Sequence, residues 1–223
     1  MIRKALLVCG VLASVVYVAG NILGALRWPG YNWISQTISE LSAIGAPSRP
    51  LLAPLGAAYG ALILVFGLGV LWLPNPKPAL QTIGGLIVAY GAVCLTGPLT
   101  PMHLRGAAAG RTLTDALHIA ATTVDVLFIL VIIAFGATVF GGRFRLYSFG
   151  TIAVLLVFGA LAGAQGPRIA ANLPTPWAGL EERVSVYGAL LWFAVLAVAL
   201  LRTSSEVPRL KRRGARAAAG SGV

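Results

Sequence analysis

Residues 114–140 read TDALHIAATTVDVLFILVIIAFGATVF, and this stretch decides the class of fold. A helix needs about 20 predominantly apolar residues to cross the hydrocarbon core of a bilayer. This stretch exceeds that length, carries one charged residue in its interior, Asp125, and ends at Gly141-Gly142-Arg143. We therefore predict a transmembrane helix, the longest in the chain.

Five further apolar stretches of comparable character lie on either side of it, at residues 5–26, 51–73, 82–99, 147–165 and 184–201. Proline and glycine mark several of their ends, and proline ends a helix because it lacks a backbone donor. The first stretch is longer than the apolar region of a cleaved signal peptide, so we interpret it as a retained span. The prediction is an all-α, polytopic transmembrane bundle of six helices.

The composition points to the same environment. Of the 223 residues, 58% are hydrophobic and 10% are charged, whereas about 25% of the residues in a typical soluble domain are charged. A soluble fold of this size would leave too much apolar surface in water. We predict one transmembrane domain over residues 1–202, and a disordered basic tail over 203–223 that lies near anionic lipid.

The net charge of +11 is interpreted through membrane topology. Basic residues gather in the cytoplasmic segments of membrane proteins. With the N-terminus in the cytoplasm, eleven Lys and Arg residues lie on that side and six lie on the other, namely Arg27, Arg49, Arg105, Arg111, Arg168 and Arg183. We predict a plasma-membrane protein with both termini cytoplasmic, an assignment that depends on the basic residues from Arg202 onward. Nucleic-acid binding is disfavoured, because no basic face carries interleaved aromatic side chains.

The span at 114–140 carries a polar stripe. Asp115, His118, Thr122 and Asp125 are spaced i, i+3, i+7 and i+10, which places them on one face of a helix. The stripe descends about 15 Å, at roughly 1.5 Å per residue, so Asp125 should lie near the middle of the membrane. Two interpretations remain open: the stripe lines a functional cavity, or it joins helices through hydrogen bonds.

The first loop on the outer side of the membrane contains ISQTISELSAI at residues 34–44. Ile34, Ile38 and Leu41 recur at helical spacing beside a face of serines, which predicts a short amphipathic interfacial helix. This helix either lies on the outer leaflet, or it covers a polar pocket with Ser39 and Glu40 facing inward.

Glu181-Glu182-Arg183 stands at the start of the last span. Acidic residues in a first helical turn complement the helix dipole, which is a sufficient structural explanation for them. We also expect Glu182 and Arg183 at the rim of the outer pocket, where Arg183 would pair with Glu40 or Asp115 across the bundle.

The stretch NWISQTISELSAIGAP at residues 32–47 resembles the first-loop signature of the domain-of-unknown-function 998 family of prokaryotic membrane proteins, with Ser42 where glycine is common. The pair Asp115 and His118 and the pair Glu182-Arg183 are also similar to that family. The resemblance implies an integral membrane protein with six spans, and it names no substrate.

Three hypotheses of function follow. The first is an outward-facing polar pocket that binds a lipid headgroup or small polar ligand, lined by Ser39, Glu40, Asp115, His118, Glu182 and Arg183. The second is a membrane-embedded lipid hydrolase in which His118 is the general base and Asp115 orients it, or, in a metal-dependent form of the hypothesis, both bind a metal with Glu40 or Glu182. The third is a proton-coupled carrier that uses Asp125 and His118. We expect membrane lipids as partners, no cofactor and no metal. A homo-oligomer and an enzymatic activity are left open.

Overall fold

The computed structural model describes residues 2–74, 76–107, 110 and 112–220, with side chains described up to Thr203. These residues form helices and turns without a strand. Six helices are long and apolar enough to cross a membrane, which confirms the predicted all-α bundle. They are α1 (Ile2–Leu26), α3 (Arg49–Leu71), α4 (Pro78–Cys94), α5 (Leu113–Gly136), α6 (Gly142–Ala164) and α8 (Ala178–Gly220). Shorter elements are α2 (Ile38–Leu41), the 3₁₀ turn η1 (Gly97–Leu99) and α7 (Gly166–Ala170).

The spans lie where the apolar stretches are, but several ends differ from the prediction. α5 ends at Gly136 rather than at residue 140, because residues 137–140 form a turn whose Val139 is buried in the core. α6 begins at Gly142 rather than 147. α8 begins at Ala178 rather than 184, which places Glu182 and Arg183 inside the helix. Hydropathy alone marks burial or lipid contact, and it does not distinguish an apolar turn from an apolar helix.

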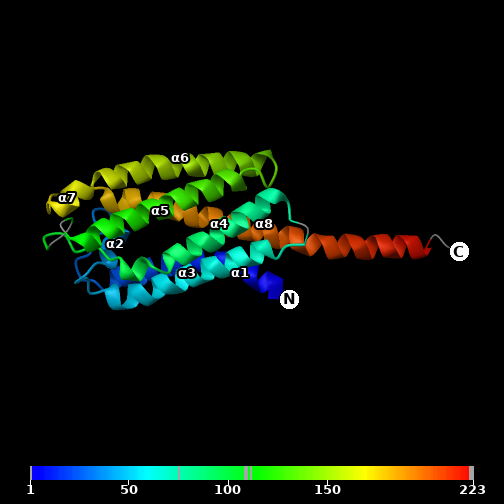
Figure 1. Ribbon diagram of the computed structural model, residues 1–223, viewed down its shortest axis with the longest axis horizontal. Helices are drawn as coiled ribbons and strands as arrows, with labels where there is room; N and C mark the ends of the chain where they lie inside the picture. The colour runs from blue at the N-terminus through cyan, green and yellow to red at the C-terminus, as the bar shows by residue number, and fades with distance from the viewer. Residues whose placement is uncertain (1, 75, 108–109, 111, 221–223) are drawn as a thin grey trace.

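The six long helices form a closed ring in chain order, with α1 packed on α3, α3 on α4, α4 on α5, α5 on α6, α6 on α8, and α8 back on α1. The N-terminus and the end of α8 lie at one end of the bundle, and α2 and α7 lie at the other (Figure 1). Small residues allow close approach within the ring. A Cβ on Gly91 of α4 would stand 2.5 Å from the backbone nitrogen of Leu64 on α3.

The interior of the ring is filled unevenly along its length. Most of the largest fully buried side chains, including Phe66, Ile87, Ile132 and Trp192, belong to the half nearer the two termini, and Leu41 of α2 is an exception. In the other half, α5 contributes little to the buried core: between Leu113 and Val131 only Asp115 is buried.

Beyond Thr203, α8 continues as a helix to Gly220 and projects past the bundle (Figure 1). The side chains of residues 204–220 and the whole of residues 221–223 lie outside the described part of the chain. The disorder expected for 203–223 stays a prediction.

Candidate functional site

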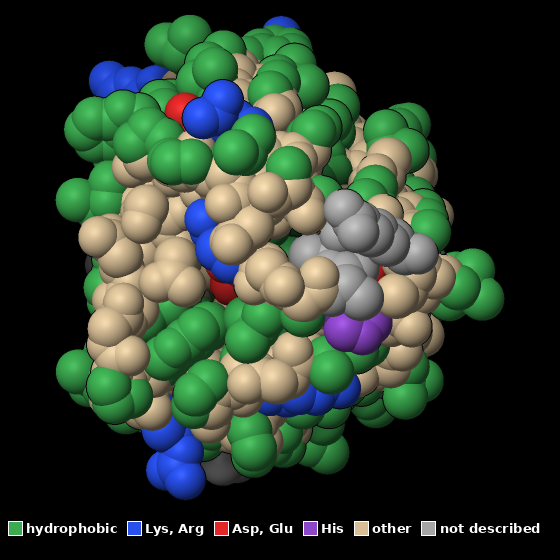
Figure 2. Space-filling model, turned by 90° about the vertical axis from the view of Figure 1, so that its left-hand side faces the viewer, with side chains coloured by type: hydrophobic (Ala, Val, Ile, Leu, Met, Phe, Trp, Pro, Cys, Tyr) green, Lys and Arg blue, Asp and Glu red, His purple; other side chains and the backbone are tan. Residues whose placement is uncertain are grey.

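The end of the bundle away from the termini is closed by three loops, which we call the cover: residues 27–48, 100–107 and 171–177. Figure 2 shows this face, where basic side chains and a recessed acidic side chain lie among backbone and small polar groups, with hydrophobic side chains gathered toward the edge. Arg111, one of the basic residues assigned to this side from the sequence, lies outside the described residues.

The first loop of the cover contains a single helical turn, α2, so the helix expected over residues 34–44 is too long. The side chain of Asn32 accepts hydrogen bonds from the backbone nitrogens of Ile34, at 2.9 Å, and Ser35, at 3.2 Å, which holds these residues in a turn. Thr37 then caps α2, with Glu40 completing a capping box. Both Ile38 and Leu41 are buried. The turn is therefore packed inside the protein rather than lying on the surface.

Glu40 binds the arginine that links the three loops of the cover. Its carboxylate is fully buried and accepts hydrogen bonds from Nε and Nη2 of Arg105, at 2.6 and 2.7 Å. Nη1 of Arg105 donates to Oγ1 of Thr175, at 3.0 Å. The hydrogen bond to Glu40 raises the pKa of Arg105. One guanidinium therefore joins all three loops of the cover.

Arg183 pairs with neither Glu40 nor Asp115, so the expected cross-bundle ion pair is wrong. Its guanidinium donates to the carbonyl oxygens of Trp33 and Gln36, at 2.8 and 3.0 Å, and to the hydroxyl of Tyr31, at 2.6 Å. It also lies over the ring of Trp33, 4.5 Å from the centroid. Burial raises the pKa of Tyr31 to about 12. Arg183 thus holds the first loop onto α8 through backbone groups, because Glu40 is already bound by Arg105.

Asp115 holds the second loop onto the start of α5. It forms a capping box with Thr112, and its Oδ1 accepts from the backbone nitrogen of His103, at 2.7 Å. Nδ1 of His103 lies 3.3 Å from both carboxylate oxygens. His118 has a different partner, since its Nδ1 lies 2.9 Å from the carbonyl oxygen of Thr100. Asp115 therefore orients His103, and the dyad of Asp115 with His118 is not formed.

A cavity of about 260 Å³, partly open to the outside, lies under α2 and is lined by residues of all six long helices. The polar residues predicted from the sequence divide into two groups around it. Ser39, His118, Thr122, Asp125 and Glu182 line the cavity. By contrast, Glu40, Asp115 and Arg183 are absent from its lining and belong to the cover.

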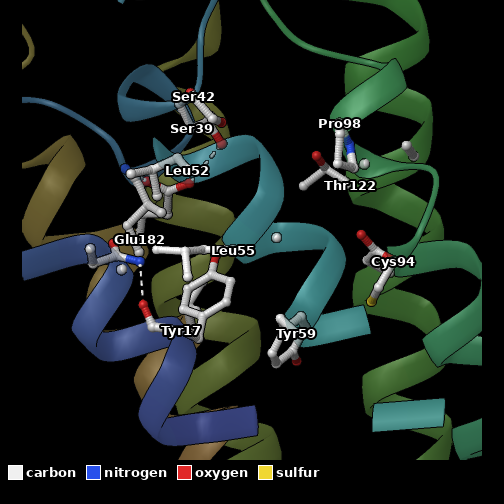
Figure 3. Close-up of a pocket in the computed structure, with 18 of the residues that line it drawn as sticks. Tyr17, Ser39, Ser42, Leu52, Leu55, Tyr59, Cys94, Pro98, Thr122 and Glu182 are labelled. Atoms are coloured by element: carbon white, nitrogen blue, oxygen red, sulfur yellow. Dashed lines mark hydrogen bonds between the residues drawn. The ribbon is translucent and has the colours of Figure 1, made fainter. Parts of the chain in front are cut away.

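The roof of the cavity is formed where α2 meets α8. The hydroxyl of Ser39 donates to Oε1 of Glu182, at 3.0 Å, and the backbone nitrogen of Ile38 donates to Oε2 (Figure 3). Glu182 therefore caps the free backbone donor of Ile38 at the start of α2, as an acidic side chain does at a helix N-terminus.

His118 presents its other ring nitrogen to the cavity region. A carbonyl oxygen can only accept, so Nδ1 is the donor to Thr100, and in the neutral ring Nε2 is the acceptor nitrogen.

Further polar residues line the cavity although they were not predicted from the sequence, among them Arg49, Asn21 and Tyr17. Arg49, at the start of α3, donates from Nη1 to the carbonyl oxygen of Ser42, at 2.7 Å. Asn21 is buried, and its Oδ1 has no hydrogen-bond partner. The ring of Tyr17 lies in the lower part of the cavity (Figure 3). An Asn inside the first apolar stretch was a signal that could have been used, whereas Arg49 was counted only as a topology charge.

Among the described residues, no group of three or more His, Cys, Asp and Glu side chains could hold a metal ion.

Searches of curated proteins and of solved structures find no match to this chain. A family model described as "Protein of unknown function (DUF998)" matches residues 11–199, from within α1 to near the apolar end of α8. The match covers all six helices that are long and apolar enough to cross a membrane. The chain is therefore a multi-pass integral membrane protein that belongs to the DUF998 family.

Proposed function

We propose that this membrane protein binds a lipid headgroup or a similar small polar ligand in the cavity under the cover. The observation that carries the proposal is the cavity itself, which reaches all six long helices in the half of the bundle where α5 contributes little to the buried core. Its lining includes Ser39, His118 and Glu182, three of the six residues for which a ligand-binding role is expected from the sequence.

The lining suits an amphiphile. Apolar side chains such as Leu52, Leu55 and Val126 offer contact to hydrocarbon, while polar groups stand at the roof. Arg49 lies there with its guanidinium bonded to carbonyl oxygens rather than to a carboxylate. A guanidinium in this condition can donate to a phosphate with charge-assisted hydrogen bonds. Mostly apolar walls with a few convergent polar groups are the usual character of a small-molecule site.

In this proposal the residues of the cover support the site without touching the ligand. Glu40, Asp115 and Arg183 each form hydrogen bonds with the backbone or side chains of the loops. They hold α2 over the cavity and so keep Ser39 and Glu182 in place.

The experiment is native mass spectrometry of the protein released from mild detergent. Gly56 lines the cavity, and a Cβ there would meet nothing within 4 Å, so Gly56→Phe should fill the space without a backbone clash. Gly85→Phe is the matched control, because Gly85 is exposed on α4 and is equally open. We expect a retained lipid with the unmodified protein and with Gly85→Phe, and its loss with Gly56→Phe. Equal retention of lipid by both variants would show that the cavity is not the lipid-binding site.

A proton-coupled carrier is the second candidate, and the observation in its favour is that His118 and Asp125 line the same cavity. It predicts substrate uptake into proteoliposomes that depends on a proton gradient and is lost in Asp125→Asn. Uptake indifferent to both would eliminate it. The hydrolase hypothesis lacks comparable support, since Asp115 and His118 have separate partners.

We further propose that the bundle lies in the plasma membrane, with the end that carries the two termini in the cytoplasm and the cover on the outer side. The support is that both termini lie at one end of the bundle (Figure 1) and that eleven Lys and Arg residues belong to that end. Single-cysteine labelling tests the orientation. A cysteine at Arg168, in α7 next to the cover, should react with a membrane-impermeant maleimide in intact cells, and one at Arg143 should react only after lysis. The reverse pattern would invert the assignment.

A further inference from the structure

Asp125 stands apart from the other acidic residues of the spans. It lies ten residues along α5 from Asp115, which is about 15 Å into the bundle at roughly 1.5 Å per residue. An acidic side chain at membrane depth costs about 2.5–3.5 kcal/mol on insertion scales unless it is paired or solvated. Asp125 is only half-buried because it faces the cavity, which it lines together with Tyr17, Tyr59 and Tyr90.

Within the part of the chain that the structure describes, no Lys, Arg or His side chain forms an ion pair with this carboxylate. Among the described residues, the ion pairs are Arg105 with Glu40 and His103 with Asp115, both in the cover. The side-chain contact found for Asp125 is with the thiol of Cys94, at 4.0 Å from its Oδ1. A thiol is a weak donor, and it leaves most of the acceptor capacity of the carboxylate unused. The acceptor capacity of Asp125 is therefore available to whatever occupies the cavity.

Three tyrosines line the cavity together with Asp125, although Tyr59 and Tyr90 are largely buried and one face of Tyr90 is stacked on Phe193. The rings of Tyr17 and Tyr59 meet edge to face with centroids 5.0 Å apart, and the hydroxyls of Tyr59 and Tyr90 lie 3.0 Å from each other. The faces of tyrosine rings attract cations, and aromatic walls around an ammonium group are a recurrent binding arrangement. The wall also carries Asn21, a buried amide whose oxygen has no partner. Asn21 and Asp125 thus both offer acceptor oxygens to the cavity.

Arg49 is the Lys or Arg side chain in the lining, and it lies at the roof of the cavity, away from Asp125. It begins α3 at the roof of the cavity, where its Nη1 is held by the carbonyl oxygen of Ser42. Asp125 is three helical turns below the start of α5. The cavity therefore has Arg49 near the cover, beside the Glu182 carboxylate that is already bonded to Ser39 and Ile38, and a second acidic group, Asp125, deeper in the bundle.

We propose that the ligand of this cavity carries an ammonium group, and that the carboxylate of Asp125 is its counter-ion among the three tyrosines. The inference rests on the proposed function, and it narrows the ligand to a class: an amine, carried either by a lipid headgroup or by a small soluble molecule. The basic group at the roof then faces an anionic part of the same ligand, such as the phosphate of a zwitterionic lipid.

The test compares two lipids with the same acyl chains, phosphatidylethanolamine and phosphatidylglycerol, which share the phosphate and differ in the ammonium group. Binding of each to the protein in mild detergent is measured by native mass spectrometry across a concentration series. We expect a preference for phosphatidylethanolamine of about tenfold or more, the scale of one charged hydrogen bond. Asp125→Asn should abolish the preference by weakening the ethanolamine lipid alone. Glu181→Gln is the control that removes a carboxylate absent from the lining.

Free ethanolamine in a further arm identifies the source of the amine. If it displaces phosphatidylethanolamine at millimolar concentration, the ammonium group alone is recognised; if only the intact lipid binds, the lipid headgroup is the source. Equal binding of the two lipids, or a preference that survives Asp125→Asn, would overturn the inference and leave lipid binding in place. Absence of any retained lipid or amine would instead remove the proposed function on which the inference rests. Asp125→Asn is neutral and should insert at least as well as the parent, and its thermal unfolding in detergent checks the fold.

Discussion

Removing Arg105 should raise the frequency with which the cover opens, while leaving the six-helix ring intact. Arg105→Met retains the length and the apolar stem of the side chain and deletes the guanidinium that binds Glu40 and Thr175. The carboxylate of Glu40 is then left fully buried, with only the backbone nitrogen and hydroxyl of Thr37 as donors.

The magnitude follows from the burial of the pair. Breaking a buried ion pair by removal of one partner costs about 3–5 kcal/mol. The side chain of Arg105 is 21% exposed and that of Glu40 is 0% exposed, so water can replace part of the lost interaction from one side only. We therefore expect a cost near the lower bound, about 3 kcal/mol, which is roughly a hundredfold change in the equilibrium for opening the loop.

Hydrogen–deuterium exchange in mild detergent measures this opening directly, because local unfolding exposes the amides of α2. The reporters are the backbone amides of Ser42 and Ala43, which donate to Ser39 and Glu40. Their exchange should accelerate by about two orders of magnitude in Arg105→Met. The control is Arg168→Met, since Arg168 is exposed and donates once, to the carbonyl of Pro174. In this variant, exchange of the Ser42 and Ala43 amides should stay within about threefold of the parent rate.

A double-mutant cycle with Glu40→Gln isolates the pair itself. Residues in direct contact show coupling energies of about 0.5–3 kcal/mol, and we expect a value in the upper half of that range for Arg105 and Glu40. Arg183→Ala with Asp115→Ala should be additive, because the two side chains have separate partners. Additivity of the first pair, or strong coupling of the second, would refute this account of the cover.

Three further predictions concern stability measured by thermal unfolding in detergent. Arg183→Lys should destabilise the protein by about 2 kcal/mol, because an ammonium cannot reproduce a planar fork that binds two carbonyls and stacks on an indole; an unchanged melting temperature would contradict this. Gly91→Ala should cost about 1–3 kcal/mol, since its Cβ meets backbone of α3, while Gly85→Ala should be neutral or stabilising; the opposite order would mean that α3 and α4 are farther apart. Trp192→Phe should cost about 1–3 kcal/mol, because the fully buried indole donates to Ser148 Oγ, at 2.9 Å; a loss below about 0.5 kcal/mol would refute that hydrogen bond's contribution.

The candidate site was only partly predictable from the sequence. The stripe on α5 did mark His118, Thr122 and Asp125, which line the cavity, because three positions on one helix face keep their relationship in any fold. Asp115 lies on the same stripe and yet belongs to the cover, since it stands in the first turn, where a carboxylate caps backbone donors. A helix face gives direction around the axis, and it does not give the depth at which a cavity begins.

The sequence by itself determined the class of the protein, its six spans and its family resemblance. Each of these depends on local properties, such as a run of about 20 apolar residues or a loop motif, that need no knowledge of neighbours. The partners of the polar groups were decided only by the tertiary structure. Glu40 binds Arg105, 65 positions away, and Glu182 caps α2 from 143 positions away. Such pairs depend on how far each helix is rotated and how each loop folds back. Hydrogen bonds are short and directional, so a shift of a few ångströms changes every partner while the hydropathy of the chain stays the same.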